Sequence, residues 1–158
     1  MPAILRTSRR VHIRIAAVLT AIAAIVGVQA ATQAPAANAM VATASVRALH
    51  IAPLYRGVPY VWGGTTPRGF DCSGYTKYVY ARAGVWIPRT AQQQYNYVHH
   101  VGKHIRPGDL VFYYNPRTHG VYHVAIYAGG SYVWHSPHPG AGVRLERNWS
   151  KYWVGGRA

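Results

Sequence analysis

One thiol and a set of imidazoles are the side chains best suited to covalent chemistry in this 158-residue chain, which contains a single cysteine, Cys72, and nine histidines. A cysteine nucleophile needs a base that takes its proton and a third polar group that orients the base. His123 and His135 are candidates because both lie inside strand patterns. A buried structural cysteine and two ordinary strand histidines are the plainer alternative.

The remaining histidines fall in the N-terminal stretch or in segments that read as loops: His12, His50, His99, His100, His104, His119 and His138. The three within residues 99–104 would also be compatible with a metal, but no carboxylate or thiol is near them in sequence. We therefore expect exposed loop there, and no metal or organic cofactor is implied.

The residues that follow the cysteine predict a helix that begins at Cys72. One face carries Cys72, Tyr75, Thr76, Val79, Tyr80 and Ala83, and Gly84 follows as the residue that ends the helix. Free N–H groups and the positive dipole end at a helix start favour a thiolate over a thiol. Asp71 would cap this helix, and we expect that orientation because a carboxylate aimed at the sulfur would raise the pKa of the thiol.

From Asp109 onward the apolar period changes to two, which predicts four short strands over residues 110–114, 122–127, 131–135 and 143–147. A helix followed by antiparallel strands indicates an α+β domain, with the helix that carries the cysteine packed on a small antiparallel sheet that carries the histidines.

The turn between the second and third strands decides whether the two imidazoles meet. If residues 128–130 form a three-residue loop with the last glycine left-handed, Tyr127 opposes Ser131 and His123 lies directly opposite His135. Their Cβ atoms are then about 5 Å apart. A two-residue turn would shift the register by one and place the rings on opposite faces. A catalytic pair requires the first arrangement.

The first 39 residues are typical of a signal peptide and its cleavage region. Four arginines precede an apolar run over residues 15–28, and small-residue cleavage signatures end at Ala30 and Ala39. An uncleaved anchor is the alternative, but a membrane span takes about 20 apolar residues and this run is shorter. We expect cleavage near 30 or 39, a short linker or N-terminal helix over 40–55, and a catalytic domain over 56–158.

Charge adds a class of partner. The chain has 17 Lys and Arg against 3 acidic residues, which favours association with polyanions. Tyrosine and tryptophan between the arginines would also suit a nucleic-acid binder. Because the chain is predicted to be exported, we expect anionic wall polymers as partners and no specific nucleic acid. A lone cysteine is also unusual in small exported folds, where cysteines normally pair, so Cys72 is a candidate reactive thiol.

Five segments carry a resemblance to a known family. In order, VPYVWGGTTPRGFDCSG, WIPRTAQQQ, RPGDLVFYY, HVAIYAGG and VWHSP resemble the motifs of the NlpC-type cell-wall peptidases, papain-like cysteine endopeptidases of bacterial envelopes, from about Val58 to Trp149. The resemblance implies a papain-like fold in which Cys72 is the nucleophile, His123 the general base and His135 its orienting residue. It also implies that the Tyr60 hydroxyl and the Cys72 backbone N–H stabilise the oxyanion.

Asp71, Ser73 and Arg89 match positions that contact the substrate peptide in that family. Each also has a plainer interpretation: a helix cap, a residue of the first helical turn and a solvated arginine. The chain departs from the family pattern at Ala91, Ala125 and Ser136, where serine, glycine and alanine are common. None of these departures removes a catalytic group, but Ala91 leaves the details of substrate recognition open.

The function implied is that of a secreted peptidoglycan endopeptidase acting on stem-peptide amide bonds, by resemblance between γ-D-glutamate and a diamino acid. An amidase or acyl-transferase on the same scaffold, or a non-catalytic wall-binding protein, is the alternative. We expect a monomer in the cell envelope or outside the cell, with no stable membrane span after cleavage.

Overall fold

The computed structural model describes residues 44–158. The predicted signal peptide and cleavage region lies outside the described residues. Residues 44–51 are helical and continue into the 3-10 helix η1 (Ala52–Tyr55), which contains Pro53. Ala48 and Ala52 are fully buried in the main core, so the folded unit includes this N-terminal helix. Among the described residues, no helix has the length and apolarity that crossing a membrane requires.

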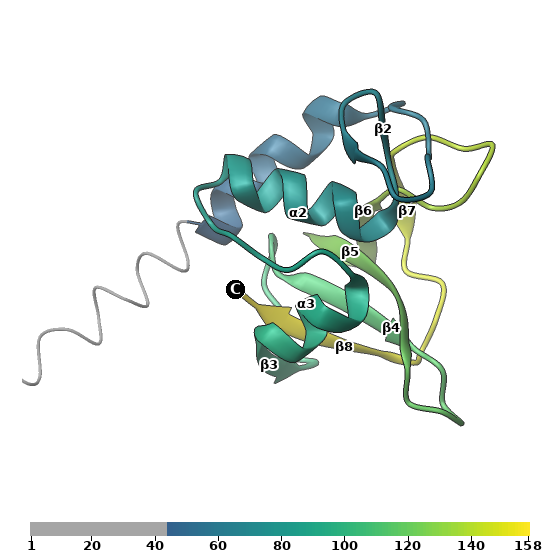
Figure 1. Ribbon diagram of the computed structural model, residues 1–158. Coiled ribbons are helices and arrows are strands. Elements are labelled where there is room, and N and C mark those ends of the chain that lie inside the picture. Colours follow the sequence, from purple (N-terminus) through teal and green to yellow (C-terminus); the bar gives the residue numbers. More distant parts are fainter. Residues whose placement is uncertain (1–43) are drawn as a thin grey trace, which may run out of the picture. The chain divides into compact units, whose positions relative to one another are not determined.

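Two helices and eight strands follow. They are β1 (Thr65–Thr66), β2 (Gly69–Phe70), α2 (Cys72–Arg82), α3 (Ala91–Tyr97), β3 (His99–Gly102), β4 (Leu110–Tyr114), β5 (Val121–Gly129), β6 (Tyr132–His135), β7 (Arg144–Arg147) and β8 (Trp153–Arg157). Strands β1 and β2 pair with each other, and the other six form an antiparallel sheet in the order β3-β8-β4-β5-β6-β7 (Figure 1). The predicted α+β class is confirmed.

Helix α2 begins and ends where its sequence predicts. The Asp71 carboxylate accepts a hydrogen bond from the backbone N–H of Gly74, which caps the first turn. At the other end Gly84 has φ +86°, the left-handed conformation that glycine adopts without strain. The buried face of the helix carries Tyr75, Thr76, Val79 and Tyr80, as the 3.6-residue period predicts.

The sheet has two apolar faces. Leu110, Phe112, Val124 and Ile126 pack with the buried side chains of α2 in the main core. The alternate residues Val111, Tyr113, Ala125 and Val133 form a second, smaller cluster with Ile105, Tyr127 and Trp153. Because side chains alternate along a strand, His123 and His135 belong with the second set.

The two-residue strands β1 and β2, helix α3 and strands β3 and β8 were not predicted. Residues 99–104 were predicted to be exposed loop, but they include the edge strand β3, whose side chains are largely exposed, and α3 just before it was not predicted. Strand β8 was missed because it carries two adjacent glycines in place of an alternating pattern. Packing explains one of them: a Cβ on Gly156 would lie 2.4 Å from Val98 and 2.8 Å from Phe112.

Candidate active site

The β5–β6 pairing places the two imidazoles on one face, but in a different register from the predicted one. Tyr127 pairs with Val133, and Gly129 pairs with Tyr132 after a bulge. The prediction that His123 lies directly opposite His135 was therefore wrong: continuing the ladder puts His135 beside Ala125. The register is offset by two residues because a bulge and a short turn replace the three-residue loop, and an offset of two keeps both rings on the same face.

The diagonal arrangement still brings the rings into contact. Nε2 of His123 and Nδ1 of His135 lie 3.0 Å apart, and the ring planes are nearly perpendicular at 87°. Trp149 packs against both imidazoles, with ring centroids 5.6 Å from His123 and 5.0 Å from His135. It also stacks on Tyr113 at 4.3 Å. The residues His123 and His135 are only 7% and 2% exposed.

The carboxylate of Glu146 is hydrogen-bonded to the outer member of the His123–His135 pair. Oε2 of Glu146, on β7, lies 2.9 Å from Nε2 of His135 and 2.7 Å from Nε of Arg144. The sequence interpretation did not include Glu146 in the site. The sequence did show an acidic residue on the strand predicted to follow that of His135. Whether Glu146 contacts His135 depends, however, on the β6–β7 register, in which His135 pairs with Arg144.

Burial sets the protonation of this group. Burial, with a smaller contribution from the neighbouring His135, lowers the pKa of His123 to about 3, although the charge of Glu146 opposes this. Burial also lowers the pKa of His135, although the hydrogen bond to Glu146 opposes this. The hydrogen bond from Arg144 holds the pKa of Glu146 below its ordinary value. At neutral pH the group formed by His123, His135 and Glu146 therefore consists of two neutral imidazoles and one carboxylate.

Cys72 is the first residue of α2 and is half-buried. Burial raises the pKa of its thiol, and the charge of Asp71 raises it further. Backbone hydrogen bonding from Val124 and Ser73 lowers the pKa but does not outweigh burial. The helix start does lower the pKa of the thiol through the backbone N–H of Ser73, as predicted, but loss of water around the sulfur is the larger effect, so the thiol is favoured over the thiolate.

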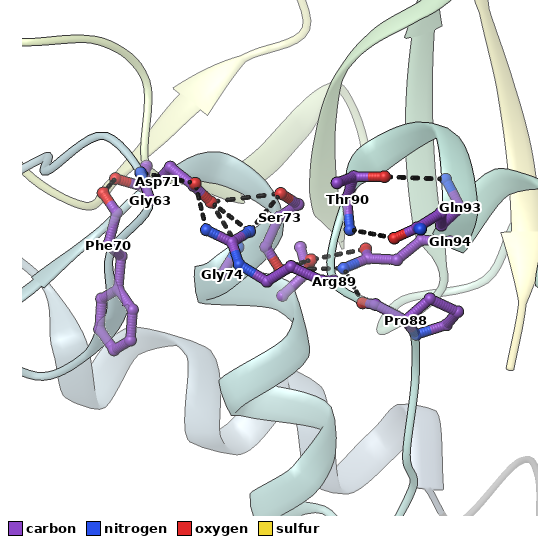
Figure 2. A network of polar contacts seen from close by, with 12 residues as sticks. Gly63, Phe70, Asp71, Ser73, Gly74, Pro88, Arg89, Thr90, Gln93 and Gln94 are labelled. Atoms are coloured by element: carbon purple, nitrogen blue, oxygen red, sulfur yellow. Dashed lines mark hydrogen bonds and ion pairs between the residues drawn. The ribbon is translucent and has the colours of Figure 1, made fainter.

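Figure 2 shows the charged side of the site. Asp71 accepts hydrogen bonds from the backbone N–H groups of Gly63 at 3.0 Å and Gly74 at 2.6 Å, which confirms the expected capping orientation. Arg89 contacts both carboxylate oxygens, at 3.1 and 2.5 Å, and its Nη1 donates to Ser73 Oγ at 2.9 Å. Burial would raise the pKa of Asp71, but Arg89 and the Gly74 N–H hold it below its ordinary value.

Gln94 of α3 holds Arg89 in place. Its fully buried amide donates to the carbonyls of Ser73 at 2.9 Å and Pro88 at 3.0 Å, which ties the loop before Arg89 to the first turn of α2 (Figure 2). Thr76 donates to the Gln94 carbonyl oxygen at 2.8 Å. Arg89 is therefore part of a fixed network, and the interpretation of it as a free surface arginine does not hold.

A single cavity of about 840 Å³ contains all seven residues predicted from the sequence: Tyr60, Asp71, Cys72, Ser73, Arg89, His123 and His135. Burial raises the pKa of the Tyr60 phenol, and so does the nearby Cys72, which keeps the hydroxyl protonated as a donor. Among the other residues that line the same cavity are Trp62, which is 87% exposed, Glu146 and Trp149. Within residues 44–158, no group of three or more His, Cys, Asp or Glu is arranged to hold a metal ion.

A cysteine at the start of a helix that packs on a histidine-bearing antiparallel sheet defines a papain-like cysteine peptidase fold. Residues 57–156 match the NlpC/P60 family model, and the chain belongs to the NlpC/P60 family. The crystal structure of the NlpC/p60 domain of the peptidoglycan hydrolase SagA has the same fold, with a TM-score of 0.64 and 35% identity; the match covers 72% of this chain and 97% of that domain.

Two curated relatives carry names that specify a bond. The chain is 47% identical over 91 residues to the gamma-DL-glutamyl hydrolase of Bacillus subtilis, covering 56% of this chain and 22% of the relative. It is 39% identical over 94 residues to the gamma-D-glutamyl-L-lysine dipeptidyl-peptidase of Bacillus cereus, covering 58% of this chain and 28% of that protein. The chain thus spans less than a third of either relative.

Proposed function

We propose that this protein is a peptidoglycan endopeptidase in which Cys72 attacks a stem-peptide amide. The observation that carries the proposal is the arrangement of groups: the thiol and the His123–His135 pair, with its 3.0 Å contact, line one cavity. The contact to His135 occupies Nε2 of His123, so Nδ1 is the ring atom available to the thiol. This is the nucleophile, base and orienter set that acyl transfer needs.

The reaction begins from neutral groups. Because the thiol pKa is raised and the His123 pKa is lowered, the proton resides on sulfur before substrate binds. His123 Nδ1 takes that proton as sulfur bonds to the carbonyl carbon. The Cys72 backbone N–H and the Tyr60 hydroxyl donate to the oxyanion. The C–N bond then breaks, the amine leaves with the proton from His123, and a thioester remains.

Water completes the cycle. His123 removes a proton from the water as it attacks the thioester carbonyl, and the released thiolate recovers this proton. The products are a carboxylic acid and an amine, which separates an endopeptidase from an acyl-transferase that would hand the acyl group to a second amine.

The bond proposed lies between γ-D-glutamate and a diamino acid. Two relatives whose names specify γ-glutamyl bonds support this choice. An amidase on the same scaffold would use the same groups on a different amide, so the products decide between them.

We further propose that the protein acts in the cell envelope or outside the cell, held by anionic wall polymers. Each of its three acidic side chains is already engaged by an arginine: Asp71 by Arg89, Asp109 by Arg157 and Glu146 by Arg144. No acidic side chain is left to oppose the remaining cations of a chain whose net charge is +14, four of these charges being the arginines of the predicted signal peptide. Binding to walls should weaken as salt rises and after acid extraction of the anionic polymers.

The test of the activity is a digestion of purified peptidoglycan followed by mass spectrometry. The wild-type protein should release fragments that end in D-glutamate, together with partners that carry a new free amine on the diamino acid. Cys72→Ala should release none and should still bind walls. Equal digestion by Cys72→Ala, or new ends at another amide only, contradicts the proposal.

A further inference from the structure

Hydrogen bonding fixes where each imidazole of the site can carry its proton. Glu146 offers only acceptor atoms, so the 2.9 Å contact to His135 requires the proton of His135 on Nε2. A neutral imidazole carries one N–H, which leaves Nδ1 of His135 as an acceptor. The 3.0 Å contact to His123 then requires a proton on Nε2 of His123. Nδ1 of His123 is left bare.

We propose that Glu146 is a positioning residue that sets the tautomer of His123 through His135, and so keeps Nδ1 of His123 free to accept the Cys72 proton. This inference rests on the proposed roles of Cys72 and His123. Without the carboxylate, the two-ring contact is equally satisfied in reverse, with His135 donating from Nδ1 and His123 accepting at Nε2. The proton of His123 would then sit on Nδ1, where it blocks transfer from the thiol.

The surroundings of Glu146 suit this task. Arg144 donates to the same carboxylate oxygen that faces His135, which holds the side chain in place. The two imidazoles themselves are shielded by Trp149, so water does not compete for the contact between the rings. The Glu146 side chain is 36% exposed, whereas that of His135 is 3% exposed, so the carboxylate lies at the rim and directs a buried pair.

Ring-nitrogen NMR of the wild-type protein tests the tautomer directly. We expect His123 and His135 each to carry the proton on Nε2 and to have a bare Nδ1. A wild-type spectrum with the proton of His135 on Nδ1 overturns the proposal, whatever any variant does.

Two substitutions separate the acceptor from its charge. Glu146→Gln keeps an oxygen that can accept from both Arg144 and His135, so the tautomers should stay as in the wild type and kcat should fall by less than about tenfold. Glu146→Ala removes the acceptor, so a fraction of His123 should carry its proton on Nδ1. Its kcat should fall about 10- to 100-fold, by analogy with the loss on removing the outer partner of a metal-binding histidine, while KM changes little.

Arg147→Ala is the matched control, because Arg147 is an exposed residue of the same strand. It should change neither the ring spectra nor kcat. If Cys72→Ala is inactive but Glu146→Ala has wild-type spectra and kcat, only the role of Glu146 fails. If Cys72→Ala retains activity, the proposed function fails independently of the spectra.

Discussion

The two walls of the cavity hold their polar groups in opposite ways. Beside the start of α2, Asp71 remains charged because Arg89 and two backbone N–H groups compensate its burial. On the sheet side, His123 stays neutral because burial outweighs the opposing charge of Glu146. A buried charge therefore persists in this site where several donors converge on it, and a buried base remains unprotonated where they do not.

The sheet wall is the one that chemistry depends on most. His123→Gln removes the atom that we propose takes the thiol proton, so we expect kcat/KM to fall by at least about 10³-fold while wall binding is unchanged. Steady-state hydrolysis of a soluble muropeptide measures this. Replacing a histidine outside the cavity, as in His104→Gln, provides the control, and a comparable loss there would mean that the effect is not one of the base.

Because His123 is neutral in the folded protein, the free energy of unfolding should depend on pH. Unfolding returns the pKa of His123 from about 3 to 6.5, so the unfolded state binds more protons between these values. The contribution of His123 to the free energy of unfolding is therefore fully present above pH 6.5. It decreases as the pH falls towards 3, by about 2 kcal/mol at pH 5. Urea unfolding at pH 7 and pH 5 measures the difference. His123→Gln should reduce it, and an equally steep loss in that variant contradicts the assignment to His123.

Features of the site that depend on residues close together in sequence could be predicted, whereas those that depend on strand pairing could not. The Asp71 cap, the start of α2 at Cys72 and the stop at Gly84 follow from residues a few positions apart, and all three are confirmed. Helix α3 was missed although Thr90 and Gln93 form a capping box, a signal present in the sequence.

The sheet wall depends on pairing between strands. The sequence predicted that His123 and His135 lie on the same face of the sheet. It did not predict the bulge that offsets their register by two residues. Glu146 joins the site only through the β6–β7 register, and the raised pKa of Cys72 depends on a burial that no local pattern encodes. These features arise from tertiary packing, so local sequence patterns could not predict them.

Substitutions beside the start of α2, where Asp71 and Arg89 lie, should reduce activity less than substitutions on the sheet side. Arg89→Gln leaves the charge of Asp71 beside the thiol without its ion-pair partner, so the pKa of Cys72 should rise further and kcat/KM should fall about tenfold. The pH dependence of thiol alkylation reports the pKa. Arg82→Gln removes the same charge at the far end of α2 and should have no such effect; equal shifts in both variants would point to net charge alone.

The smallest expected change comes from opening the sheet wall to water. Trp149→Ala uncovers both imidazoles, so the pKa values of His123 and His135 should rise towards 6.5 and kcat should fall by only a few fold. NMR titration of the ring protons follows the pKa values. Trp86→Ala, which removes an exposed tryptophan away from the cavity, serves as the control. Unchanged pKa values in Trp149→Ala would mean that the indole does not shield the pair.

Because Cys72 is the only cysteine in the chain, one reversible reaction tests its role most directly. A disulfide-forming thiol reagent is added in steps, the labelled fraction is followed by intact-protein mass spectrometry, and muropeptide hydrolysis is assayed on the same samples. Activity should fall in proportion to the labelled fraction and return when the label is reduced off. Fully labelled protein that hydrolyses its substrate at the wild-type rate would contradict a nucleophilic Cys72.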